Sequence, residues 1–327
     1  MCTALTLQTE EFYFGRNMDI EYSFGEQVVI VPRKFSLKFK KMETLEHHYA
    51  MMGMAAIIEN TPLFAEGFNE KGLCVAGLNF PQFAHYEEQE LEGKYNIAPY
   101  EIIAFLLGKC DSVDSAVKVM EEFRIVAIPF QENIPLASLH FIIADKEKSV
   151  VLEQTQKGVS IHQNPFGILT NNPPFDFHMN NISQYMAMSS KQPTNCIYPT
   201  KEIKAFSQGF GALGLPGDFS SASRFVKTAF LKGNSRCELD NDSSIVQFFH
   251  ILESVAFVKG AVMTLEDKED ITLYSCCCNI DQMTYYYKTY ENSQITGIKL
   301  QLNDVDHEKM KVFPLRKELC VYYQEVK

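Results

Sequence analysis

The sequence predicts an α+β fold in which two antiparallel sheets lie face to face between two outer layers of helices, a four-layer αββα sandwich. Strand-like segments occur in blocks, and blocks of helix-like segments separate them, unlike the regular alternation of βαβ units. Hydrophobic residues make up 46% of the 327, which is enough for a large core. No internal repeat, low-complexity tract or long linker is visible, so we expect residues 1–327 to form one domain.

The first ninety residues are mainly strand-like, and two helices follow them. Residues 3–7 alternate polar and apolar side chains, 27–31 is rich in β-branched residues, and 73–78 is an apolar run. The first helix is expected at about 99–108, because proline stands at its start and glycine at its end. Ser112 can cap the second helix, whose apolar residues share one face.

Strands return in the middle of the chain and again near its end. A charged turn at 145–148 joins residues 139–144 and 150–155 as a hairpin, and further strands are expected at 159–162 and 167–170. The later segments comprise three helices and one hairpin, expected at 178–189, 221–231, 243–258, and 272–279 with 284–290. The polar stretch 189–207 is the best candidate for a long excursion from the core.

Charge and hydropathy exclude several classes of protein. The net charge of −11 and the pI near 5.3 argue against nucleic acid and anionic membrane surfaces as partners, since both attract clustered Lys and Arg. The N-terminus has no basic start and meets two acidic residues too early for a signal peptide. Apolar stretches such as 51–58 are shorter than the roughly 18 residues that span a bilayer.

The nine cysteines form neither a disulfide framework nor a paired C-x-x-C zinc motif. Neighbouring strand residues point to opposite faces, so Cys276, Cys277 and Cys278 cannot converge on one ion, and a buried structural role is preferred. We therefore expect a reduced, cytoplasmic chain without metal or organic cofactor.

Most of the common enzyme motifs are missing from the sequence. It contains no G-x-S-x-G elbow, no H-E-x-x-H zinc helix and no phosphate-binding P-loop. Residues 209–214, GFGALG, formally match a dinucleotide fingerprint, but no apolar strand precedes them and Pro216 stops any helix. A glycine-rich turn is the better interpretation.

Cys2 is the main candidate nucleophile. A small residue can follow Met1 by chance, but a small second residue also permits removal of Met1, which would give Cys2 a free α-amine. Such an amine has an ordinary pKa of about 7.7–8.0 and a thiol of about 8.5, so the amine can take the thiol proton without a histidine. These properties suit nucleophilic attack on an amide carbonyl.

Arg16 and Asp19 strengthen this hypothesis. If residues 3–7 and 12–14 pair as a hairpin, both side chains return to the Cys2 end. A guanidinium favours the thiolate and a carboxylate can anchor the α-ammonium. The alternative is a surface Arg–Asp pair, which contributes little.

Together with further segments, these residues resemble the conjugated bile acid hydrolases (choloylglycine hydrolases) of the N-terminal nucleophile superfamily. The resemblance covers essentially the whole chain. The motifs that carry it occur in family order and are MCTA at 1–4, FGRNMD at 14–19, NEKGL at 69–73, AGLNF at 76–80, LTN at 169–171, GLPGD at 214–218, FFHIL at 248–252 and TYEN at 289–292. The family fold is also an αββα sandwich.

The resemblance implies a role for each matched residue. Cys2 would be the nucleophile and, through its amine, the base, while Asp19 would hold that amine. Arg16 and Arg224 would orient and support the thiolate, and Asn79, through its backbone N–H, and Asn171 would stabilise the oxyanion. The steroid of the substrate would lie against an apolar pocket made of Met18, Ile58, Ala65, Phe130 and Ile134.

The resemblance further implies hydrolysis of glycine- and taurine-conjugated bile acids and assembly as a homotetramer, with residues 189–207 in the contacts. Two alternatives are penicillin V acylase, against which Asn79 argues because those enzymes more typically have Tyr there, and a non-catalytic lipid-binding protein. Phe141, Phe177 and Cys74 depart from the residues usual in relatives, and these departures affect the expected pocket shape rather than the nucleophile.

Overall fold

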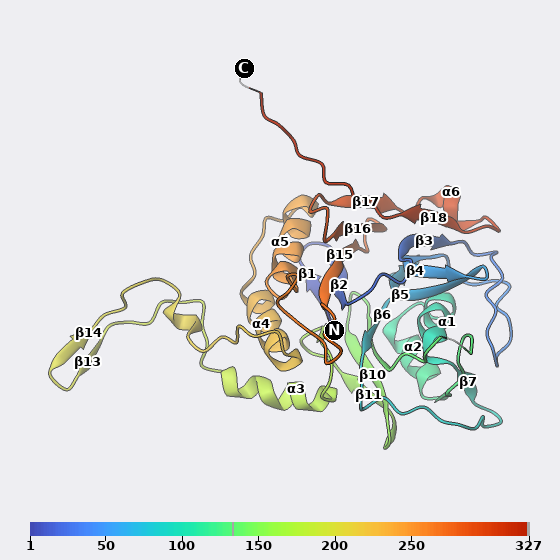
Figure 1. Cartoon of the computed structure of the whole chain (residues 1–327), viewed down its shortest axis with the longest axis horizontal. Helices are drawn as coiled ribbons and strands as arrows, with labels where there is room; N and C mark the ends of the chain where they lie inside the picture. The colour runs from blue at the N-terminus through green and yellow to red at the C-terminus, as the bar shows by residue number, and fades with distance from the viewer. Residues whose placement is uncertain (133, 326–327) are drawn as a thin grey trace.

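The structure, a computed structural model, describes residues 1–132 and 134–325, and its centre is a pair of stacked antiparallel sheets (Figure 1). The first sheet has the order β12 (Ile168–Leu169), β1 (Cys2–Gln8), β2 (Phe12–Ile20), β15 (Ile271–Asn279), β16 (Thr284–Thr289) and β17 (Thr296–Lys299). The second has the order β11 (Gly158–Gln163), β10 (Ser149–Thr155), β9 (Leu139–Ala144), β6 (Cys74–Asn79), β5 (Thr61–Asn69), β4 (Met51–Ile58), β3 (Gln27–Val31) and β18 (Lys311–Pro314).

Helices cover the outer faces of both sheets. On the second sheet lie α1 (Ile102–Lys109) and α2 (Val113–Met120), whose buried side chains share one apolar cluster with β3 to β6, β9 and β10. On the first sheet lie α4 (Ser221–Asn234) and α5 (Asn241–Glu253), which join the cluster that fills the space between the sheets. The predicted four-layer αββα sandwich is therefore confirmed (Figure 1).

The remaining elements are short. They are α3 (Phe175–Asn181), α6 (Leu302–Val305), the parallel pair β7 (Tyr95–Ile97) and β8 (Phe123–Ile125), the hairpin β13 (Cys196–Tyr198) and β14 (Lys201–Ile203), and three 3₁₀ turns at Pro99–Glu101, Ile182–Tyr185 and Phe210–Ala212. No helix in the described part of the chain is long and apolar enough to cross a membrane.

Two predicted helices have different ends in the structure. The helix expected at 178–189 begins at Phe175, directly after Pro174, and already tightens into a 3₁₀ turn after Asn181. Proline is well suited to a helix start, whereas Asn180 and Asn181 are poor helix formers. The helix expected at 243–258 is α5, which begins earlier because the side chain of Asp240 caps it and ends earlier, at Glu253.

The β1–β2 hairpin brings three predicted site residues to one end of the first sheet. Cys2 pairs with Met18 and Ala4 pairs with Arg16, so Arg16 and Asp19 return to the Cys2 end as predicted. On its other side β2 pairs with β15. A Cβ atom at position 15 would lie 2.0 Å from the carbonyl oxygen of Cys276, so glycine permits this close approach of β2 and β15.

Candidate active site

Cys2 is the first residue of β1 and is only 3% exposed. Its main-chain nitrogen donates to Asn171 Oδ1 at 2.8 Å. Met1 precedes it, so this nitrogen is a peptide nitrogen that stands where the α-amine would lie after removal of Met1. The amine of Met1 itself donates to the carbonyl oxygen of Asp19 and lies 3.3 Å from Asp270 Oδ2. Cys2 and its main-chain nitrogen, the candidate nucleophile and base, are therefore held in place by Asn171.

Arg16 is fully buried behind Cys2. Its Nη1 donates to the carbonyl oxygens of Gly77, at 2.5 Å, and Ala65, at 3.3 Å, and lies 3.7 Å from Glu66 Oε2. Burial by itself disfavours the charged guanidinium, but the negative groups at Cys2 and Glu66 outweigh it and raise the pKa of Arg16. Arg16 is therefore a permanent, buried positive charge near Cys2.

Asp19 is buried close to the N-terminal amine. Its Oδ1 accepts from Thr272 Oγ1 at 2.5 Å, while its Oδ2 is buried without a hydrogen-bond partner among the described residues. Burial raises the pKa of Asp19, and the positive charges of Arg224 and the chain's amine oppose this rise. The open oxygen is suited to accept a hydrogen bond from an ammonium group.

Arg224 of α4 links Cys2 to Asn171. Its Nη1 donates to the Cys2 carbonyl oxygen at 2.5 Å and to Thr3 Oγ1 at 2.6 Å, and its Nη2 donates to Asn171 Oδ1 at 2.7 Å. Asn171 Nδ2 donates to the main-chain carbonyl of Asn79 at 2.7 Å. Burial lowers the pKa of Arg224, and the charges of Asp19 and Cys2 oppose this effect. The other five residues predicted to be catalytic therefore lie around Cys2.

Only some of the residues predicted for an apolar pocket adjoin the site. Met18 and Ala65 adjoin the site, because the sulfur of Met18 lies 3.6 Å from Arg16 Nη2 and the carbonyl of Ala65 accepts from Arg16. Ile58 and Ile134 are half-buried, at the end of β4 and in the loop before β9.

Phe130 lines a cavity of about 330 Å³. Its ring packs edge-on against Tyr100, with centroids 5.5 Å apart, and Lys40 Nζ lies 5.2 Å from its centre. Segment 35–40 and the turn between β4 and β5 form other walls of this cavity, and Cys2 is not among its lining residues.

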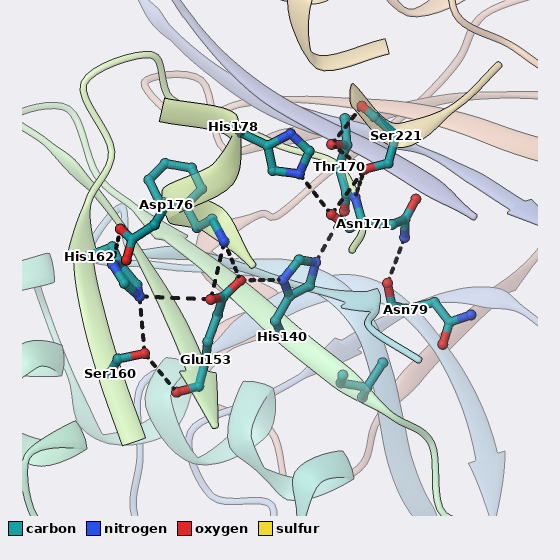
Figure 2. A network of polar contacts seen from close by, with 12 residues as sticks. Asn79, His140, Glu153, Ser160, His162, Thr170, Asn171, Asp176, His178 and Ser221 are labelled. Carbon is teal, nitrogen blue, oxygen red and sulfur yellow. Dashed lines mark hydrogen bonds and ion pairs between the residues drawn. The ribbon is translucent and has the colours of Figure 1, made fainter. Parts of the chain in front are cut away.

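Sequence reasoning missed several polar groups around the site. Behind Arg16, the buried carboxylate of Glu66 accepts from the hydroxyls of Tyr274, at 2.9 Å, and Tyr285, at 2.6 Å. Burial raises the pKa of Glu66, and Arg16 opposes this rise. A charged residue within the apolar strand segment 63–68 was the available signal for Glu66. A second group lies around Asn171 and consists of His140, Glu153, His178 and Ser221 (Figure 2). Its members are far apart in the sequence, so no local pattern indicates that they meet.

Comparison with known proteins identifies the family of the chain. The family described as "Linear amide C-N hydrolases, choloylglycine hydrolase family" matches residues 2–313. The chain is 45% identical over 322 residues to the bile salt hydrolase/transferase of Lactiplantibacillus plantarum, covering 98% of this chain and 99% of the relative. It is 41% identical over 327 residues to the bile salt hydrolase/transferase of Clostridium perfringens, covering 98% and 99%.

Solved structures agree with the sequence comparison. The C2A mutant of the conjugated bile acid hydrolase from Clostridium perfringens superposes with a TM-score of 0.92 at 39% identity, over 99% of this chain and 100% of that one. The penicillin V acylase from Agrobacterium tumefaciens has a TM-score of 0.74 at 16% identity, over 96% and 91%, which demonstrates a shared fold. The chain belongs to the choloylglycine hydrolase family of linear amide C–N hydrolases.

Proposed function

We propose that this chain hydrolyses the amide bond between a bile acid and glycine or taurine, with Cys2 as the nucleophile. The observation that carries the proposal is the convergence of Arg16, Asp19, Asn171 and Arg224 on Cys2, since binding a lipid without reaction requires none of them together. The names of the relatives supply the substrate class.

The reaction begins with removal of Met1. The released α-amine of Cys2 takes the thiol proton, directly or through water, and is held as an ammonium by Asp19 and Asn171 Oδ1. The thiolate, favoured by Arg16, attacks the amide carbonyl. Collapse of the tetrahedral intermediate passes the proton to the leaving nitrogen, releases the amino acid and leaves a thioester. Water, deprotonated by the same amine, then attacks the thioester and releases the bile acid.

Asn171 supplies the hydrogen bond to the developing oxyanion. A carboxamide carries two N–H hydrogens, and Asn171 donates one of them to the carbonyl of Asn79 at 2.7 Å. The second is available for the acyl oxygen, and a donor of this kind is worth about 10²–10³-fold in turnover. We propose that the backbone N–H of Asn79 is the partner donor.

Recognition of the steroid body should dominate substrate choice. A bile acid is a rigid amphipath whose amide lies at the end of a short tail, and each Å² of apolar surface it buries contributes about 25 cal/mol. We propose that Met18, Ala65, Ile58 and Ile134 provide this surface, with Phe130 as a further member of the set.

A panel of substrates tests the assignment. Purified protein is incubated with glycine- and taurine-conjugated bile acids and with penicillin V, and the released amino acid or side-chain acid is quantified. We expect cleavage of both types of bile acid conjugate, at much higher kcat/KM than for penicillin V. Faster cleavage of penicillin V than of every bile salt would refute the substrate class and leave the cysteine mechanism standing.

We further propose a homotetramer in the reduced cytoplasm, where Cys2 stays a free thiol. Residues 189–207 leave the body of the molecule as an extended arm that carries β13 and β14 (Figure 1). The arm exposes Ile197, Tyr198, Ile203 and Phe206, the last by 91%, and monomers rarely leave such apolar clusters in water. Light scattering at micromolar concentration tests this assembly, and a clean monomer refutes it.

A further inference from the structure

The backbone of Asn171 is held by buried polar side chains that the reaction above does not use (Figure 2). Its nitrogen donates to the Ser221 hydroxyl at 2.8 Å, and its carbonyl oxygen accepts from the same hydroxyl at 2.9 Å. His178 Nε2 lies 3.0 Å from that carbonyl oxygen. Burial lowers the pKa of His178, so its ring is neutral and carries its hydrogen on Nε2, facing the carbonyl.

His140 and Glu153 form a buried pair beside the same segment, with side chains 0% and 1% exposed. His140 Nδ1 lies 3.0 Å from Glu153 Oε1, and its Nε2 lies 3.1 Å from the carbonyl oxygen of Thr170. The carbonyl oxygen of Thr170 and an ionised Glu153 are both hydrogen-bond acceptors, so one hydrogen must lie in each of the two contacts of His140. Either the imidazole carries both hydrogens, or the carboxyl group supplies the one at Nδ1. The pair has no net charge in either form, which suits its burial.

Glu153 also contacts the far end of the segment that contains Asn171. Its two oxygens lie 3.0 Å and 3.2 Å from the main-chain nitrogen of Phe175, the first residue of α3. One carboxyl group therefore ties Phe175 directly and Thr170 through His140. Residues 170–175 form a short loop closed by this connection, and Asn171 lies within the loop.

We propose that His140 and Glu153 are positioning residues, which hold Asn171 where its free amide hydrogen meets the acyl oxygen. This inference rests on the proposed function, because it takes Asn171 as the oxyanion donor. The contacts of the pair run to residues 170 and 175, whereas the charge that favours the thiolate belongs to Arg16. Loss of the pair therefore lowers turnover and leaves the nucleophilicity of Cys2 intact.

Two substitutions at position 153 test whether the hydrogen bonds of this side chain hold Asn171 in place. Glu153→Ala removes the contacts to both His140 and Phe175. Glu153→Gln has the same shape and reproduces the neutral form of the pair, because its amide donates to His140 Nδ1 while its oxygen accepts from Phe175. Asp145→Ala is the matched control, since Asp145 is a half-buried carboxylate that accepts from the main-chain nitrogen of Val113, the first residue of α2, at 2.7 Å and lies outside the proposed site.

We expect Glu153→Ala to lower kcat about 10- to 100-fold, the range expected for a displaced catalytic group, with KM changed less than about twofold. Alkylation of Cys2 by a small thiol reagent, followed by peptide mass spectrometry, should proceed at the wild-type rate. Glu153→Gln should stay within about threefold of wild-type kcat, and Asp145→Ala should lose stability but keep its turnover. In an Asn171→Ala background, Glu153→Ala should lower kcat no further, because the two residues act through one interaction.

Hydrogen exchange of peptides that cover residues 170–175 gives a readout independent of activity. Exchange there should rise in Glu153→Ala and stay at the wild-type level in Glu153→Gln. Unchanged exchange or turnover in Glu153→Ala, equal losses in the Ala and Gln variants, or an undiminished effect in the Asn171→Ala background would each overturn the positioning role. A wild-type protein that cleaves no conjugated bile salt would instead refute the proposed function, and the exchange data would still decide whether the pair orders this loop.

Discussion

Replacement of Asn171 by alanine is the sharpest test of the site, because the side chain serves both structure and reaction. Its Oδ1 accepts from Cys2 N and Arg224 Nη2, and its Nδ2 donates to the carbonyl of Asn79. Each neutral bond contributes about 1 kcal/mol and the one to a charged group about 1.5–3 kcal/mol. Asn171→Ala should therefore lower the free energy of unfolding by about 3.5–5 kcal/mol and lower kcat by about 10²–10³-fold.

Asn79→Ala provides the matched comparison. The side chain of Asn79 is exposed, and the contact to Asn171 uses only its main-chain oxygen, which alanine retains. We expect this variant to unfold within about 0.5 kcal/mol of the wild type and to keep most of its turnover. Urea unfolding and steady-state kinetics on the two proteins decide the matter. Equal stability in both variants, or a kcat of Asn171→Ala near that of the wild type, would refute the hypothesis that the Asn171 side chain serves both structure and reaction.

Three further predictions concern the nucleophile, its substrate and one buried base. Cys2→Ser should lose most activity, because an alcohol is far harder to deprotonate than a thiol. The intact mass of the active wild-type protein should correspond to a chain without Met1. An active protein that retains Met1 would contradict the amine mechanism. Phe130→Ala should reduce preference for bile acids without changing alkylation of Cys2, and an unchanged substrate panel would remove Phe130 from the pocket. Burial lowers the pKa of Lys232 from 10.5 to about 8, so between these pH values the unfolded chain binds a proton that the folded chain lacks. Stability of the wild type relative to Lys232→Met should therefore rise by about 3 kcal/mol from pH 8 to 10.5, and parallel urea-unfolding curves would contradict this.

The fold was predictable because its signals are local. Alternation in residues 3–7, the charged turn at 145–148 and the apolar spacing of α5 each specify one element from its own sequence. The helix ends were less predictable. The start of α3 depends on Pro174 together with a buried carboxylate from β10, and that partner is 22 residues away.

The site residues also differ in whether local or long-range contacts bring them together. Arg16 and Asp19 were predictable because a short hairpin returns them to Cys2. The contacts of Glu66 and His140 join strands distant in sequence, as in the bond from Tyr274 to Glu66 across 208 positions. No periodicity encodes such pairs, so their role emerges only from the packed sheets. The position of Phe130 beside Tyr100 and Lys40 likewise depends on loop conformation rather than on pattern.

The placement of Met1 has a consequence for the timing of maturation. An aminopeptidase must hold the free amine and side chain of the residue it removes. In the folded chain that amine contacts the Asp19 carbonyl and Asp270, and the sulfur of Met1 lies 3.9 Å from Arg224 Nη2. If Met1 is removed as proposed, we expect its excision to be easiest on the nascent chain, before β15 and α4 pack around β1. A chain that folds first would keep its amine in these contacts, so we expect the specific activity of a rapidly expressed preparation to follow the fraction of molecules that lack Met1.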